Sequence, residues 1–156
     1  MWNSEFLIQL ITSLIGSAAF AVLFKIRPRH LPLVALGGGI TYFVYFVINY
    51  FFSSVFAAAF IASSVSAIYA EVCARLKKAP AVVFVLPCAI PIVPGGSLYK
   101  TMFNFISQDT SAAIQYLLET LKVAIGIAGG LVAVSLIFHL VNAIISYVLK
   151  KRNSFN

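Results

Sequence analysis

The residues best placed to do chemistry lie in one short segment where prolines and glycines interrupt an apolar run. The segment reads Ile90-Pro91-Ile92-Val93-Pro94-Gly95-Gly96-Ser97-Leu98-Tyr99-Lys100-Thr101-Met102. Two prolines remove backbone N–H donors and two glycines permit tight turns, so an unbroken helix is not expected here. A helix that restarts after the break presents free N–H groups and a partial positive charge, and both attract carboxylates.

This arrangement predicts a substrate-binding site for a carboxylate. Gly95 and Gly96 would let the ligand approach the backbone closely, and Ser97 could cap the new helix or contact the ligand. Tyr99 and Lys100 add a hydroxyl and a cation within one turn, although Lys100 could instead extend toward the membrane surface. The expected substrate-binding residues are Pro91, Pro94, Gly95, Gly96, Ser97, Tyr99 and Lys100. A purely structural kink is the alternative.

Two ionisable residues in apolar segments are candidates for a proton relay. His139 lies deep in the last apolar segment, where a functional role and a merely satisfied histidine are both open. Glu71 lies four residues before Arg75, a spacing that also allows an ion pair on a helix surface.

An enzymatic reading finds little support. Ser97 and Lys100 fit the S-x-x-K spacing of acyl-serine enzymes, but the companion K-T-G and S-D-N motifs are absent, as is H-E-x-x-H. Cys73 and Cys88 lie in apolar stretches without metal-ligand spacing and are expected to be small core residues. We therefore expect no catalytic residues, no cofactor and no bound metal.

The composition indicates a membrane protein. The chain has 156 residues, of which 62% are hydrophobic and 10% charged, whereas an average soluble domain has about 25% charged residues. A small soluble fold could not bury so much apolar surface. The net charge of +7 does not indicate nucleic acid, because the basic residues form short clusters between apolar runs.

The apolar runs predict an all-α polytopic fold, with residues 1–156 forming a single transmembrane domain. Five spans are expected at about 4–24, 31–52, 54–74, 81–106 and 117–149, the fourth broken at the Pro/Gly motif. A helix that enters at Ala81 and rises 1.5 Å per residue reaches Pro94 after roughly 20 Å. The break is therefore expected near the middle of a hydrocarbon core about 30 Å thick.

The basic clusters predict the orientation of these spans. Lysine and arginine prefer the cytoplasmic side, and five spans place the clusters at 25–30, 75–80 and 150–152 all on that side. The N-terminus would then lie outside and the C-terminus in the cytoplasm, in a multi-pass protein of the plasma or inner membrane. If the segment 81–106 re-entered instead of crossing, residues 150–152 would lie outside.

Polar residues at helical spacing predict which faces of the spans avoid lipid. The stripes are Gln9, Ser13, Gly16 and Ser17 in the first span, Gly38, Thr41, Tyr45 and Asn49 in the second, and Ser135, His139, Asn142 and Ser146 in the fifth. We expect them to face a common interior or a partner. For the glycine, serine and threonine positions, close helix packing is the alternative, as it is for Gly126 and Gly130.

The broken segment also carries a family resemblance. Its pattern P-x-x-P-G-x-x-x-Y, formed by Pro91, Pro94, Gly95 and Tyr99, resembles the threonine/serine exporter (ThrE) family. Chain length, the five-span plan and the place of the motif in the fourth span resemble in particular the small, separately encoded YjjB-like half. Lys100 is not part of the family pattern.

The resemblance implies a subunit of a secondary exporter of small polar metabolites, either amino acids such as threonine and serine or dicarboxylates such as succinate. Because fused exporters contain a second membrane half that is absent here, it also implies a larger membrane partner. The alternative is a structural or assembly subunit without its own substrate site.

Overall fold

The computed structural model describes the backbone of residues 4–153 and the side chains of residues 5–144 and 147. Every regular element in this part of the chain is a helix. In chain order the elements are α1 (Ser4–Leu23), the 3-10 turn η1 (Pro28–His30), α2 (Leu31–Phe52), α3 (Val55–Lys77), α4 (Val82–Ala89), the 3-10 turn η2 (Ile90–Ile92), α5 (Gly95–Ile106) and α6 (Thr110–Asn153).

Local sequence explains where the first helices begin and end. α2 starts beside Pro32, a favourable residue in the first helical turn, and ends where Ser53 adopts a left-handed conformation with φ of 49°. The next residue, Ser54, caps α3 by accepting a hydrogen bond from the Ala57 N–H at 3.4 Å. α3 ends at Lys77, and the next residue, Lys78, is again left-handed with φ of 51°.

The helices have the length and composition of membrane spans. Among the described residues, α1, α2 with the preceding turn, α3 and α6 are each long and apolar enough to cross a membrane. The pair formed by Val82–Ile92 and Gly95–Ile106 is bent by 52° and provides a fifth span if counted as one. The predicted all-α polytopic fold and the break within residues 81–106 are confirmed, whereas a crossing rather than a re-entry of this bent pair stays a prediction.

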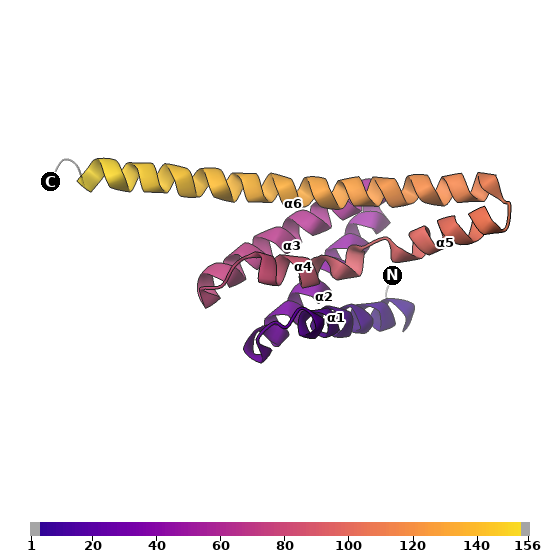
Figure 1. The fold of residues 1–156 in the computed structure, drawn as a ribbon, viewed down its shortest axis with the longest axis horizontal. Coiled ribbons are helices and arrows are strands. Elements are labelled where there is room, and N and C mark those ends of the chain that lie inside the picture. Colours follow the sequence, from indigo (N-terminus) through magenta and orange to yellow (C-terminus); the bar gives the residue numbers. More distant parts are fainter. Residues whose placement is uncertain (1–3, 154–156) are drawn as a thin grey trace.

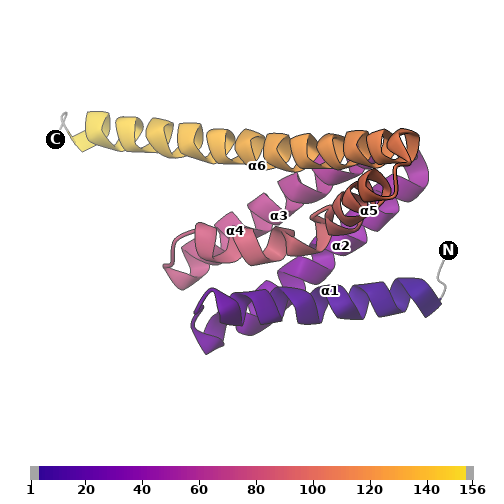
Figure 2. The same ribbon diagram turned by 45° about the vertical axis from the view of Figure 1, so that its right-hand side comes forward.

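The first three helices form a bundle into which α4 inserts (Figures 1 and 2). α4 contacts α1, α2 and α3, and its Phe84 and Cys88 are fully buried. Ala21 of α1, Val34 of α2 and Ala70 of α3 complete this core. The small side chains of α1 and α3 allow close helix approach, which drives helix association in membranes.

α6 is a helix of 44 residues, about 66 Å long at 1.5 Å per residue. It runs parallel to α3, since Gly126 lies against the start of α3 at Phe56 and Asn142 meets Arg75 near its end. A Cβ added at Gly126 would be 2.8 Å from the Phe56 carbonyl oxygen, so this glycine serves close packing, as expected. The C-terminal part of α6 extends beyond the other helices in both views (Figures 1 and 2).

Two boundaries differ from the prediction. α3 continues to Lys77 rather than ending at residue 74, because basic side chains stabilise the last turn of a helix. α6 begins at Thr110 rather than at residue 117. Asp109 precedes it and its carboxylate accepts a hydrogen bond from the Ala112 N–H at 3.1 Å. Residues 110–115 are therefore the first turns of a capped helix.

The first two basic clusters meet at one end of the molecule. Lys25, Arg27 and Arg29 line the same cavity as Lys78, so the segment between α1 and α2 lies beside the segment between α3 and α4. This agrees with the expectation that both clusters share one side of the membrane. Which side that is remains a prediction.

Candidate functional site

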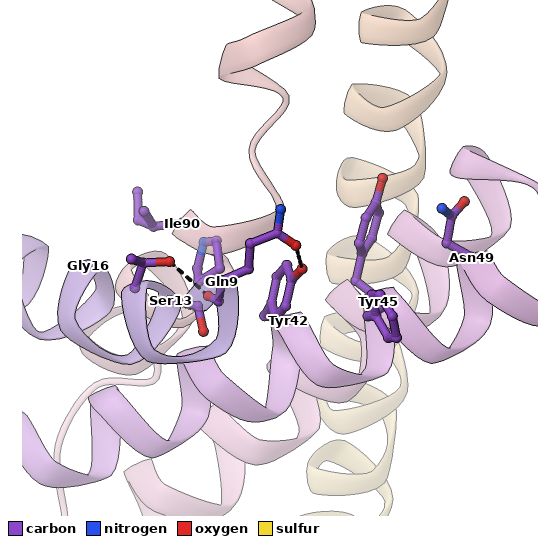
Figure 3. A pocket seen from close by; sticks show the side chains of 10 residues that line it. Gln9, Ser13, Gly16, Tyr42, Tyr45, Asn49 and Ile90 are labelled. Carbon is purple, nitrogen blue, oxygen red and sulfur yellow. Dashed lines mark hydrogen bonds between the residues drawn. The ribbon is translucent and has the colours of Figure 1, made fainter. Parts of the chain in front are cut away.

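A polar cavity of about 530 Å³ opens between α1, α2 and the turn η2 (Figure 3). Its lining residues are Gln9, Thr12, Ser13, Gly16, Tyr42, Tyr45, Phe46, Asn49, Ile90 and Pro91. Glutamine, serine, threonine, tyrosine and asparagine supply hydrogen-bond donors and acceptors in an otherwise apolar bundle. Such a lining suits a small polar ligand.

The predicted polar stripes of the first two spans build most of this lining. Gln9, Ser13 and Gly16 come from α1, and Tyr45 and Asn49 come from α2. The two helices are joined across the cavity because the Tyr42 hydroxyl donates a hydrogen bond to Gln9 Oε1 (Figure 3). These five residues therefore share one cavity, as expected for stripes that face a common interior or a partner.

The other stripe residues pack the helices together deeper in the bundle. A Cβ added at Gly38 would overlap the Ser17 side chain, so α2 passes directly over Ser17. Thr41 is fully buried and donates to the Gly37 carbonyl oxygen at 2.8 Å. The packing alternative therefore holds for Ser17, Gly38 and Thr41, which do not line the cavity.

The Pro/Gly motif produces the expected break. η2 ends at Ile92, Val93 is extended with ψ of 128°, and α5 begins at Gly95 after Pro94. Of the motif, Pro91 lines the cavity. Gly95 and Gly96 are exposed, and a Cβ added at either would meet nothing within 4 Å.

The start of α5 presents backbone donors next to a carboxylate. The Gly95 N–H donates to the Val93 carbonyl at 2.8 Å, and the Leu98 N–H donates to the Pro94 carbonyl at 3.0 Å. The N–H groups of Gly96 and Ser97 lie in the first turn, where a helix has no acceptor of its own for them. The Ser97 hydroxyl donates to Glu119 Oε1 at 3.2 Å.

Glu119 of α6 is a member of this site that the sequence interpretation missed. It bonds to Ser97 of the motif and interacts electrostatically with Tyr45, which lines the cavity. Its carboxylate also lies near the positive end of the α5 dipole, a favourable position. The signal that could have found it is the scarcity of acidic residues, since the chain has only four.

Tyr99 and Lys100 are not among the residues that line the cavity. Both are exposed. Tyr99 stacks on Phe103 within α5, with ring centroids 6.2 Å apart. The Lys100 ammonium lies 5.1 Å from the centre of the Tyr116 ring, and this contact joins α5 to α6.

The two candidate proton-relay residues lie away from this cavity. Glu71 forms the ion pair that its separation of four residues from Arg75 allows, with 3.9 Å between Glu71 Oε2 and Arg75 Nε. Arg75 also donates to Asn142 Oδ1 at 3.0 Å and lies over the Phe138 ring.

His139 does not face the interior of this chain, so of the two expected surroundings of its stripe, a common interior or a partner, only the partner stays a prediction. It is exposed, with Ser135 and Asn142, and it lines an open groove on α6. The reason is that α3 packs against the opposite face of α6, through Gly126 and Gly130. The side chain of Ser146, the last residue of this stripe, lies outside the described part.

The described residues contain no group of three histidine, cysteine, aspartate or glutamate side chains that could hold a metal ion. Cys73 and Cys88 are free thiols buried in the helical core. The Cys88 thiol lies 3.6 Å from the Val34 carbonyl oxygen.

Comparison with known proteins agrees with the motif. No curated protein and no solved structure matches the chain. A family model described as "Threonine/Serine exporter, ThrE" matches residues 9–137, well over half of the chain and including both the cavity and the break. The chain is therefore a multi-pass membrane protein of the threonine/serine exporter family.

Proposed function

We propose that this chain is the small subunit of a secondary exporter of threonine/serine-type amino acids, and that the polar cavity with the neighbouring break forms part of the substrate path. Family membership supports the transport function. The observation that carries the proposal is the position of the Glu119 carboxylate between the start of α5 and the polar cavity. Glu119 accepts a hydrogen bond from Ser97 of α5 and acts electrostatically on Tyr45, which lines the cavity.

The site has a positive and a negative binding group side by side, which suits the two opposite charges of an amino acid. The free N–H groups at Gly96 and Ser97 carry partial positive charge and would bind the substrate carboxylate. Glu119, within hydrogen-bond reach of Ser97, would bind the substrate ammonium group. A dicarboxylate such as succinate would bring a second negative charge toward Glu119, which is unfavourable at low dielectric. Amino acids are therefore the preferred substrates in this proposal.

A larger membrane partner completes the proposed exporter. Ser135, His139 and Asn142 lie on an exposed face of α6, and polar residues are costly against lipid. None of the described α5 residues is buried, although the helix carries several large apolar side chains. These faces support a protein neighbour. In this setting His139 is a candidate proton relay at the subunit boundary, and Glu71 is the second candidate.

The test is efflux of labelled threonine from cells that express this chain with and without its partner. Glu119→Gln removes the charge but keeps the shape, and we expect efflux to fall about tenfold or more, the loss of one charge-assisted bond. Glu5→Gln is the matched control, because Glu5 is an exposed carboxylate in the first turn of α1. Normal efflux by a correctly inserted Glu119→Gln protein would contradict the proposal.

The dependence of efflux on the partner distinguishes a transport role of this chain from a structural or assembly role. Deleting either protein should abolish the same efflux. If the partner alone transported threonine at the full rate, this chain would be a structural or assembly subunit without its own substrate site.

A further inference from the structure

A second cavity, of about 350 Å³, lies at the opposite end of the bundle from the polar cavity. It opens between the segment that joins α1 to α2 and the segment that joins α3 to α4. Four cationic side chains line it, those of Lys25, Arg27, Arg29 and Lys78. No carboxylate is found among its described lining residues; Glu71 lies in a neighbouring cavity and pairs with Arg75.

A buried histidine in the cavity wall has a ring nitrogen without a hydrogen-bond partner among the described residues. His30 is 3% exposed, and its Nε2 accepts a hydrogen bond from Arg29 Nε at 3.2 Å. A neutral imidazole that accepts at Nε2 carries its proton on Nδ1. This Nδ1 has no partner among the described residues, which is uncommon for a buried polar atom.

The backbone positions of the two lysines are set by the ends of α1 and α3. Lys25 and Lys78 follow α1 and α3 in the left-handed conformation, with φ of 55° and 51°. Glycine is the least costly residue at such positions, whereas each lysine brings a cation to the cavity and to a helix C-terminus. These four cationic residues are exposed, so water screens their mutual repulsion in part, and an anion bound between them would reduce it further.

We propose that this cavity binds a phosphate group, presented either by an anionic phospholipid or as free phosphate. Phosphate offers several acceptor oxygens, and arginine binds it through two parallel N–H bonds. Phe24, Ile26 and Val83 add apolar walls beside the cations, which suit the glycerol and first acyl carbons of a lipid. Basic pockets between membrane helices are typical headgroup sites. The bound group would join the two connecting segments and stabilise the bundle at this end.

The test uses the purified full-length chain in a neutral detergent. The probes are short-chain phosphatidylglycerol, inorganic phosphate and succinate, with binding measured by native mass spectrometry and by thermal melting. We expect one phosphatidylglycerol per chain and a higher melting temperature. Competition by inorganic phosphate identifies the phosphate group itself as the ligand, and no competition identifies the lipid headgroup; both support the proposal. Equal binding of succinate, or no binding of either phosphate probe, overturns it.

The decisive variant is the double substitution Lys25→Gly and Lys78→Gly. Because glycine suits both left-handed positions, the unliganded protein should fold at least as well, and its affinity for phosphatidylglycerol should fall about tenfold or more. Lys122→Gln is the control for the loss of a lysine charge elsewhere, since Lys122 is exposed on α6 and does not line the cavity. An equal loss in the control, or none in the double variant, overturns the proposal.

Discussion

Two groups of glycines show how differently the two halves of the molecule are built. Gly37, Gly38 and Gly39 lie in the middle of α2, where an added Cβ would collide with side chains of α1, α3 or α4. Gly95 and Gly96 begin α5, where an added Cβ would meet nothing within 4 Å. The first group provides close packing. The second stands in open space beside a half-helix N-terminus.

The packed glycines of α2 are structural, whereas the exposed glycines of α5 belong to the candidate functional site. The contacts of Gly37, Gly38 and Gly39 are closed, because small residues there let the backbones approach. The α5–α6 hairpin is open, with exposed apolar and polar residues that its own chain does not cover. Substitutions at the packed glycines should change stability, and substitutions at the exposed start of α5 should change transport.

The largest expected effect is that of Gly38→Ala on stability. The new Cβ would lie 2.5 Å from Ser17 Cβ, so the two helices must separate, at a cost of about 1–3 kcal/mol. The melting temperature of the purified protein should fall accordingly. Gly16→Ala is the control, because a Cβ there would meet nothing within 4 Å.

A double-mutant cycle tests the cause of that loss. In a Ser17→Gly background the collision partner is absent, so adding Gly38→Ala should cost much less than it does in the wild type. An unchanged cost would mean that the α1–α2 contact is not what constrains Gly38.

The next effect is that of Gly95→Leu on transport. Gly95 is exposed and its φ is not positive, so leucine should fold and insert with little change in stability. Efflux of threonine should nevertheless fall about tenfold, because the side chain covers the free N–H groups of α5. Normal efflux by a correctly assembled Gly95→Leu protein would leave the break as a structural kink only.

A smaller, few-fold effect is expected from His139→Leu. Because His139 is exposed on α6, the melting temperature of this chain alone should not change. Recovery of the complex with the larger partner, and efflux at each pH tested, should both decrease. Full efflux with an unchanged pH dependence would leave His139 without a role in a proton relay.

Helix boundaries could be predicted from the sequence where neighbouring residues start or stop the helix. α2 was predicted at 31–52 and observed at Leu31–Phe52, since a proline opens it and a serine turn closes it. The predicted last span began at 117 because the apolar run starts there, whereas α6 begins at Thr110, since a capped helix tolerates polar residues such as Gln115.

The site was only partly predictable. Gln9 and Ser13 repeat at helical spacing, so a polar face of α1 could be recognised without knowing its neighbour. The contact between Ser97 and Glu119 could not, because it depends on how α5 folds back on α6 and no spacing rule covers it. For the same reason the sequence could not tell that His139 lies on the face of α6 that α3 leaves uncovered.

The smallest effect is expected at Asp109, which caps α6 in the open hairpin. Its carboxylate accepts hydrogen bonds from the Ala112 N–H at 3.1 Å and the Ser111 hydroxyl at 2.9 Å, and these bonds lower the pKa of Asp109 in the folded protein. A lowered pKa in the folded state means that the contribution to stability is present above the unfolded-state pKa and is lost as the pH falls through the folded-state pKa. Asp109→Asn keeps an oxygen that can cap the helix but does not titrate, so the difference in melting temperature between wild type and variant should shrink on acidification. A difference that stays constant from neutral to acidic pH would show that the charge of Asp109 does not stabilise the start of α6.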